Sequence, residues 1–304
     1  MSINLQTTIS GIRLKNPTML ASGVLGVTKA SLINVAKNGG GAVVSKSISK
    51  NPRQGHPAPI ITTYEAGMLN AVGYSNPGAL KAKEEFANID QIGSPAILSI
   101  IGQEVEDFVE VWETLKNCGF KAIEVPLSCP HTPGYGTMGG QHTPAMAEKI
   151  TRALKQAADV PVIIKVSPNE NMVTVARAAV EAGADAITAV NTMGPGMIIN
   201  IDVHKPILGF GMGGVSGAAL RPVAVRCVFD LYKAVKIPII GCGGVTTGRD
   251  MIEMMMAGAM AVQIGTAIYS RTVQAFKLIV DEATDWLNKQ GYKKITDIIG
   301  LAHR

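Results

Sequence analysis

Residues 162–190 read VIIKVSPNENMVTVARAAVEAGADAITAV and contain one complete strand–helix–strand unit. The apolar runs 162–166 and 186–190 are short and rich in β-branched residues, which predicts strands buried on both faces. Between them, residues 173–182 carry apolar side chains at helical spacing, and Gly183 suits the left-handed conformation that often ends a helix. Two buried strands joined by one helix predict a parallel pair with the helix packed across it.

The same unit recurs along the whole chain. Eight short apolar runs are each followed by a longer segment at helical spacing, which is the number expected for a closed parallel barrel rather than an open sheet. We therefore predict an α/β fold, a single (β/α)8 TIM barrel that spans residues 1–304 as one domain. The predicted strands are residues 18–21, 42–45, 96–100, 122–125, 162–166, 186–190, 238–241 and 261–264. The predicted helices are residues 30–37, 79–89, 105–117, 145–157, 173–182, 218–235, 250–257 and 271–290.

Segments outside this repeat are of two kinds. Residues 3–14, with Gly11 in the middle, predict an N-terminal hairpin that covers the bottom of the barrel. Long insertions of about 34, 20 and 27 residues follow the second, fourth and sixth strands. Long ordered loops at the carboxyl ends of barrel strands are usually functional, so we expect the site there.

Composition excludes several classes of protein. The chain is 47% hydrophobic and 17% charged, too apolar for a disordered protein. Its 28 basic and 23 acidic residues are scattered, which argues against a nucleic-acid arm and allows only a mild attraction to small anions. The four cysteines form no C-x-x-C pair, so we expect no disulfide framework and no metal site. Neither a signal peptide nor a membrane span is recognisable, which predicts a soluble cytoplasmic protein.

Polar or glycine residues follow the predicted strands, where they would meet at one face of the barrel. Gly243-Gly244 and Gly265-Thr266 fit a phosphate cradle, because glycine lets backbone N–H groups approach an anion; ordinary turns are the alternative. Lys46 and Lys165 end apolar strands and have no helix face along which to reach solvent. Their ammonium groups suit an electron-rich cofactor ring or a carboxylate.

Cys129 is the candidate reactive group. It lies between Ser128 and Pro130 and opens a glycine-rich loop that runs to Gly140 and is a candidate lid. An unperturbed thiol titrates near about pH 8.5 and accepts a proton when activated. A small buried hydrophobe is the ordinary interpretation of a cysteine, and we expect it for the other three. These are Cys118, Cys227 and Cys242.

Together these motifs resemble class I dihydroorotate dehydrogenases, most of all the catalytic subunit of the B-type enzymes. The resemblance extends from about Leu14 to Tyr269, and the order and spacing of the motifs make it specific. The motifs that carry it are Ala21-Ser-Gly23, Lys46-Ser47, Gly67-Met-Leu-Asn-Ala-Val-Gly73, Asn76-Pro-Gly78, Ser128-Cys-Pro130, Lys165-Val-Ser-Pro-Asn169, Asn191-Thr192, Gly213-Gly-Val-Ser-Gly217, Gly243-Gly244 and Val262-Gln-Ile-Gly-Thr266.

The resemblance implies an FMN-binding barrel that oxidises (S)-dihydroorotate to orotate in de novo pyrimidine (UMP) biosynthesis. Cys129 would be the catalytic base that removes the C5 proton while hydride leaves C6 for the flavin. The implied substrate-binding residues are Lys46, Asn70, Ala71, Val72, Gly73, Tyr74, Asn191 and Thr192. The implied cofactor-binding residues are Ser22, Lys46, Ser47, Lys165, Val190, Gly217, Gly243, Gly244, Gly265 and Thr266. No metal is implied.

The resemblance also implies a homodimer, with an FAD and iron–sulfur subunit as a possible electron-transfer partner. Residues 209–214, GFGMGG, match G-x-G-x-x-G but lie in a long loop without the strand and helix of a dinucleotide fold. The chain also lacks a cysteine set for an iron–sulfur cluster. NAD would therefore act through a second subunit, and the physiological electron acceptor stays open.

Several residues depart from the family pattern, and they leave alternatives open. Pro126 replaces the usual Asn before Ser-Cys-Pro, and Ser99, His131 and Tyr74 replace an Asn, an Asn and a Leu. Ser-Cys-Pro-His also resembles the flavin barrel of dihydropyrimidine dehydrogenases, which reduce uracil or thymine. The segment 68–73 favours dihydroorotate, because it is the carboxylate-holding element of the family. A phosphate-binding isomerase or lyase, or a non-catalytic flavoprotein subunit, is the remaining alternative.

Overall fold

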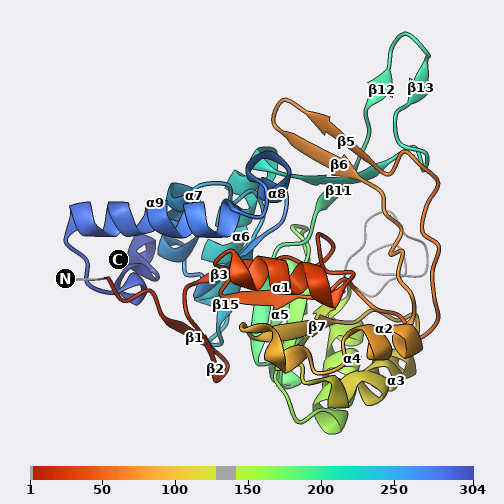
Figure 1. Cartoon of the computed structure of the whole chain (residues 1–304), viewed down its shortest axis with the longest axis horizontal. Coiled ribbons are helices and arrows are strands. Elements are labelled where there is room, and N and C mark those ends of the chain that lie inside the picture. Colours follow the sequence, from red (N-terminus) through yellow and green to blue (C-terminus); the bar gives the residue numbers. More distant parts are fainter. Residues whose placement is uncertain (1–2, 128–141) are drawn as a thin grey trace.

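Eight parallel strands close into a barrel, as the sequence predicts (Figure 1). A computed structural model describes residues 3–127 and 142–304 of the chain. Strands that follow one another in the barrel repeat are hydrogen-bonded neighbours, and the last pairs with the first. In chain order the barrel strands are β3 (Thr18–Leu20), β4 (Ala42–Val44), β7 (Ala96–Ser99), β8 (Ala122–Pro126), β9 (Val162–Val166), β10 (Ala186–Ala189), β15 (Ile239–Cys242) and β16 (Ala261–Ile264).

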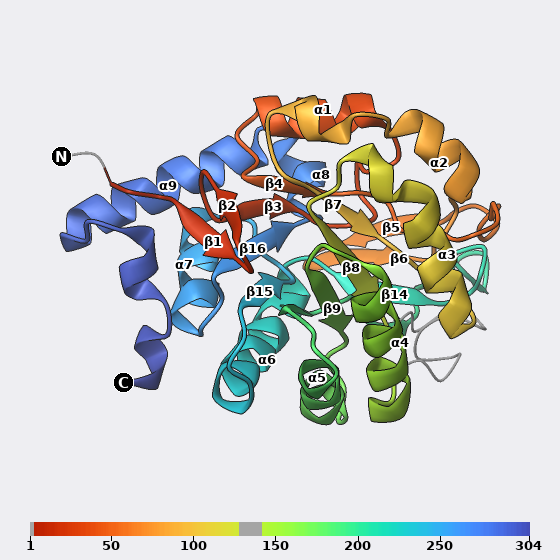
Figure 2. The same cartoon turned by 90° about the horizontal axis from the view of Figure 1, so that it is seen from below.

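Helices surround the strands on the outside (Figure 2). They are α1 (Lys29–Lys37), α2 (Ala79–Glu85), α3 (Val105–Leu115), α4 (Pro144–Ala157), α5 (Met172–Glu181), α6 (Arg221–Ala234), α7 (Gly248–Met256), α8 (Ala267–Arg271) and α9 (Ala275–Gln290). Two predicted boundaries were wrong by four residues. The helix predicted at 271–290 begins at Ala275, because Thr272 has a positive φ of 56° that separates it from the short helix ending at Arg271. The helix predicted at 79–89 ends at Glu85, and Asn88 is left-handed with φ 53°.

The bottom of the barrel is sealed by the N-terminal hairpin, as predicted. Strands β1 (Thr7–Ile9) and β2 (Ile12–Leu14) are antiparallel, with Ile9 and Leu14 buried. These two side chains join an apolar cluster with inward-facing residues of the barrel strands, among them Met19. Burying apolar area stabilises the fold by roughly 25 cal/mol per Å². The hairpin therefore stays packed against the end of the barrel opposite the predicted site.

Two insertions far apart in the chain pair to form one antiparallel sheet. Strands β5 (Ile61–Tyr64) and β6 (Gly67–Asn70) follow β4, whereas β11 (Met193–Gly196) and β14 (Gly213–Ser216) follow β10. The strand order is β11-β14-β6-β5. The insertion after β8, including residues 128–141, lies mostly outside the described residues.

A small hairpin extends from this sheet away from the barrel (Figure 1). It consists of β12 (Ile199–Asn200) and β13 (Lys205–Pro206), which are antiparallel. Over residues 3–127 and 142–304, the chain has no helix with the length and apolar character needed to span a bilayer.

Candidate active site

A cavity of about 360 Å³ lies at the carboxyl ends of the barrel strands, bordered by the antiparallel sheet. Most of the residues predicted from the sequence line this one cavity. They are Ser22, Lys46, Ser47, Asn70, Val72, Gly73, Tyr74, Lys165, Val190, Asn191, Thr192, Gly243, Gly244, Gly265 and Thr266.

Three predicted residues are placed differently. Ala71 is fully buried and is not part of the cavity lining. Gly217 also does not line it, although its carbonyl lies directly behind Gly244. Cys129, the predicted base, and His131 lie outside the described residues.

Some lining residues were not predicted from the sequence. Gln263 is almost completely buried in β16, and its amide reaches the cavity. A polar residue inside an apolar strand is the signal that could have indicated it. Cys242, which we expected to be an ordinary buried hydrophobe, also lines the cavity at the end of β15. Ser216 and Tyr269 are further lining residues that no local pattern indicated.

One end of the cavity is formed by backbone groups that suit an anion. Gly243 and Gly244 connect β15 to the α7 loop with φ values of 129° and 74°. A Cβ atom at Gly244 would lie 2.6 Å from the Cβ of Arg221, so no other residue fits there without movement. Among the described residues, no hydrogen bond is donated by the backbone N–H groups of Gly244, Gly265 or Thr266. These exposed donors fit a phosphate group.

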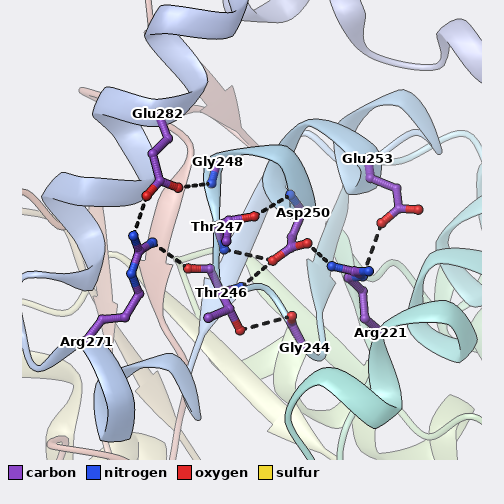
Figure 3. Close-up of polar contacts among 9 residues, drawn as sticks. All are labelled: Arg221, Gly244, Thr246, Thr247, Gly248, Asp250, Glu253, Arg271 and Glu282. Carbon is purple, nitrogen blue, oxygen red and sulfur yellow. Dashed lines mark hydrogen bonds and ion pairs between the residues drawn. The ribbon is translucent and has the colours of Figure 1, made fainter. Parts of the chain in front are cut away.

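The loop behind this cradle is fixed by the carboxylate of Asp250 (Figure 3). Asp250 Oδ2 accepts the N–H groups of Thr246 at 2.9 Å and Thr247 at 2.8 Å, and Oδ1 pairs with Arg221. Thr247 in turn caps α7 by accepting the Asp250 N–H at 3.3 Å. Reciprocal capping of this kind satisfies the open donors at a helix start and holds the loop in one conformation.

A second ion pair fixes the other side of the same loop (Figure 3). Arg271 pairs with Glu282 and donates to the Thr246 carbonyl at 2.7 Å, while Glu282 accepts the Gly248 N–H at 2.7 Å. The hydrogen bond from Arg271 holds the pKa of Glu282 below its usual value. These contacts hold the loop at residues 244–248 in one conformation without a ligand.

Another part of the cavity lining presents side chains instead of backbone. Lys46 is buried with 7% of its surface exposed, and its own N–H donates to the Gly26 carbonyl at 2.8 Å. Asn70 on β6 donates to the Gly214 carbonyl on β14 at 3.2 Å, so the two paired insertions hold it. A cation beside an amide can bind a carboxylate and a neighbouring polar ring.

Three serine hydroxyls connect neighbouring strand ends at the barrel mouth. Ser47 lies 3.1 Å from Ser22 and 2.9 Å from Ser99, measured between the hydroxyl oxygens. Ser99, which departs from the family pattern, is fully buried and is not part of the cavity lining. Its hydroxyl shares a hydrogen bond with the Ser47 hydroxyl and so orients that side chain.

His142, which directly follows the undescribed segment 128–141, is clamped to the β9–α5 loop. Its Nε2 accepts the Ser167 N–H at 3.2 Å, and its Nδ1 lies 2.9 Å from the Asn169 amide. Burial lowers the pKa of His142 to about 4, so the ring is neutral near pH 7. A neutral ring is what the contact requires, because a protonated ring cannot accept the Ser167 N–H.

Comparison with known proteins agrees with this geometry. The family model described as dihydroorotate dehydrogenase matches residues 4–287. The chain belongs to the dihydroorotate dehydrogenase family. A relative from Methanosarcina mazei, named dihydroorotate dehydrogenase B (NAD(+)), catalytic subunit, is 46% identical over 98% of this chain and 95% of its own length. A relative of the same name from Methanothermobacter thermautotrophicus is 41% identical, over 100% of both chains.

These relatives do not favour the dihydropyrimidine dehydrogenase alternative, because they carry the name of the B-type catalytic subunit. Among solved structures, a dihydroorotate dehydrogenase from Eimeria tenella in complex with ferulenol superposes with a TM-score of 0.83. That match covers 99% of this chain and 89% of the other, at 23% identity. At this identity the match supports the barrel fold alone.

Proposed function

We propose that the chain oxidises (S)-dihydroorotate to orotate in pyrimidine biosynthesis, with FMN as its bound flavin. The observation that carries this proposal is one cavity lined by two unlike sets of groups. Open backbone donors lie at Gly244, Gly265 and Thr266, and the buried cation Lys46 and the amide of Asn70 line the same cavity. Family membership supplies the reaction, since the relatives are named for dihydroorotate oxidation.

The family is flavin-dependent, and we assign FMN because the cradle fits a single terminal phosphate. Gly243, Gly244, Gly265 and Thr266 would hold that phosphate. The ring would be lined by Ser22, Ser47, Lys165, Val190 and the region of Gly217. When bound, the flavin supplies a hydride acceptor. The chain's own residues orient it and supply positive charge beside the ring, where reduction adds electron density.

Substrate binding is assigned to the other end of the cavity. Lys46 would pair with the substrate carboxylate, with Asn70 and the segment 71–74 holding the carboxylate and ring from one side. Asn191 and Thr192 would close the opposite side. Cys129 would take the C5 proton as base. Lys46 near a carboxylate favours dihydroorotate over dihydrouracil, which has no carboxylate.

We further propose a homodimer with an FAD and iron–sulfur subunit as electron-transfer partner. The phrase "catalytic subunit" in the relatives' names supports a second kind of subunit. The exposed apolar side chains Met197, Ile199, Ile201 and Val203 on and beside the β12–β13 hairpin support a contact with another chain. The isolated chain should then reduce dyes but not NAD.

Cofactor extraction tests the assignment of FMN. The protein should release one FMN per chain on heat denaturation, identified by chromatography of the supernatant. FAD in the supernatant would remove the phosphate-cradle assignment, and a colourless protein that cannot be reconstituted with FMN would contradict the proposed function.

A further inference from the structure

The floor of the cavity rests on a buried polar cluster, of which the proposed function uses only Lys165. Five adjacent positions in the barrel contribute to it: Glu124 on β8, Lys165 on β9, Thr188 on β10, Cys242 on β15 and Gln263 on β16. Glu124 and Thr188 have no exposed surface. Lys165, Cys242 and Gln263 line the cavity, whereas Glu124 and Thr188 lie behind them.

The hydrogen bonds around Glu124 define its charge. Its Oε2 accepts from the Thr188 hydroxyl at 2.8 Å and from the Gln263 amide N–H. Its Oε1 has no hydrogen-bond partner among the described residues and lies 3.8 Å from Lys165 Nζ. Both hydrogen bonds to Oε2 are donated by its neighbours, and the group facing Oε1 is an ammonium, which is the arrangement that a carboxylate accepts. Glu124 is therefore a carboxylate.

Gln263 fixes the direction of the Lys165 side chain. Its Oε1 accepts from Lys165 Nζ at 2.7 Å, while its amide nitrogen donates to Glu124. One amide thus connects the cation to the anion, and the ammonium is held at the cavity floor. A buried charge without such a partner is costly, because burial removes its hydration.

The titratable groups that face Lys165 are Glu124 and Cys242. The neighbouring strands β10 and β16 contribute uncharged groups, the hydroxyl of Thr188 and the amide of Gln263. Lys46 is a further cation that lines the same cavity. Burial raises the pKa of the Cys242 thiol, so it is neutral near pH 7 and adds no charge. Burial lowers the pKa of Lys165, and the Cys242 and Glu124 side chains outweigh it and raise that pKa, Cys242 by its charge only at the high pH where its thiol ionises. Near neutrality the counter-charge comes from Glu124.

We propose that Glu124 is a positioning residue that keeps Lys165 charged and directed at the cavity floor, and so determines how many protons accompany reduction of the bound flavin. The inference rests on the proposed function, because it places the flavin above Lys165. Two electrons enter the flavin on reduction. With Lys165 already an ammonium, the added negative charge is compensated without a further proton entering the floor.

Removing the Glu124 charge changes this proton count. In Glu124→Gln the shape is retained, but the ammonium loses its counter-charge, and burial can lower a lysine pKa by about 3–5 units. The neutral amine would then take up one proton from solvent each time the flavin accepts two electrons. The midpoint potential should fall more steeply with pH, between about pH 6 and 8, by an amount equal to about one extra proton per two electrons.

The experiment measures the midpoint potential of the flavin-loaded protein across that pH range by titration against reference dyes. Thr188→Val is the matched control, because it removes a buried hydrogen bond to the same Oε2 but keeps the charge. We expect Thr188→Val to keep the pH slope of the unmodified chain and Glu124→Gln to steepen it. A Glu124→Gln slope equal to that of the unmodified chain overturns the inference.

A second measurement covers a Glu124→Gln chain too unstable to hold flavin. Urea unfolding of the flavin-free chains compares Glu124→Gln with the double variant Glu124→Gln/Lys165→Met, which removes both charges. Breaking a buried pair costs more than replacing both members, so the double variant should recover a higher urea midpoint. A double variant no more stable than Glu124→Gln overturns the pairing. If the unmodified chain binds no flavin, the proposed function fails, and the urea comparison still decides on the pair.

Discussion

In one part of the cavity lining the binding groups are backbone donors, and in another they are the side chains of Lys46 and Asn70. The donors at Gly244 and Gly265 belong to two short loops, and Asp250 and Arg271 hold the first of these from behind. Lys46 and Asn70, in contrast, offer side chains, and Asn70 is held by its hydrogen bond to the Gly214 carbonyl across the antiparallel sheet. Different residues fix the two groups, since Arg221 and Arg271 hold the loop after β15, whereas Gly214 holds Asn70. We therefore expect cofactor retention and substrate turnover to respond to different substitutions.

The largest effect is expected for Cys129→Ala. Loss of a positioned general base usually slows a reaction by about 10²–10⁴-fold, so flavin reduction by dihydroorotate should slow by that factor. Bound FMN should stay at one per chain, because the phosphate end is untouched. Anaerobic stopped-flow mixing measures the rate of flavin reduction, and the flavin absorbance before mixing gives the FMN bound per chain.

Cys118→Ala is the matched control, because Cys118 is buried at the end of α3, away from the cavity. It should change neither the rate nor the flavin content. Equal losses at both positions would give Cys129 a structural role only.

Acid should destabilise the folded chain through His142. Its pKa is about 4 in the folded chain and 6.5 as a free side chain, so only the unfolded state gains the proton as pH falls from 6.5 toward 4. Stability from this group is complete above pH 6.5, and about 2 kcal/mol should be lost by pH 5. Urea unfolding at pH 7 and pH 5 measures the loss.

His142→Gln should lose less stability than the unmodified chain over the same interval, because its amide does not titrate there. The carboxylates contribute equally to both chains, so the difference isolates His142. An identical loss in the two chains would show that His142 does not carry the pH dependence.

Asp250→Ala should weaken the phosphate end selectively. It removes the acceptor for the Thr246 and Thr247 N–H groups, and loss of such a cap costs about 1–2 kcal/mol. FMN should dissociate more readily, while the KM for dihydroorotate in the flavin-saturated protein stays unchanged. Fluorescence of released flavin measures the first quantity.

Asp281→Ala serves as its control, because the pair with Lys277 is exposed on α9 and such pairs contribute little. It should leave FMN affinity unchanged. A change in KM as large as the change in FMN affinity in Asp250→Ala would mean that the two ends are not independent.

The smallest effect is expected for Pro126→Asn. Pro126 lines the cavity at the end of β8, where the family usually has an amide side chain. One added hydrogen bond contributes about 0.5–1.5 kcal/mol, so kcat/KM for dihydroorotate should rise about 2–10-fold. Pro126→Ala frees the backbone without adding an amide and should give no gain. A rise of equal size in both variants would assign the effect to backbone freedom.

The barrel and the glycine turn after β15 could be predicted from the sequence because their signals are local. Eight apolar runs alternate with helical segments, and Gly243-Gly244 directly follows one of these runs. Helix boundaries were less predictable, since the break at Thr272 depends on a single backbone conformation rather than on an apolar pattern.

The sheet that carries Asn70 could not be predicted in this way. It pairs residues 67–70 with 213–216, and hydrogen bonds between strands so far apart in the chain leave no periodic trace in either segment. The buried cluster around Glu124 was missed for a related reason. Glu124, Thr188 and Gln263 each interrupt an apolar strand, and only the closed barrel brings these polar groups together.

Anaerobic bleaching of the bound flavin tests the central claim, that one cavity joins a cofactor end to a carboxylate-binding end. Dihydroorotate and dihydrouracil should be compared in the unmodified chain and in Lys46→Ala. We predict rapid bleaching by dihydroorotate alone in the unmodified chain, and a selective loss of that advantage in Lys46→Ala. Preferential bleaching by dihydrouracil, or an equal loss for both compounds in Lys46→Ala, would contradict the account.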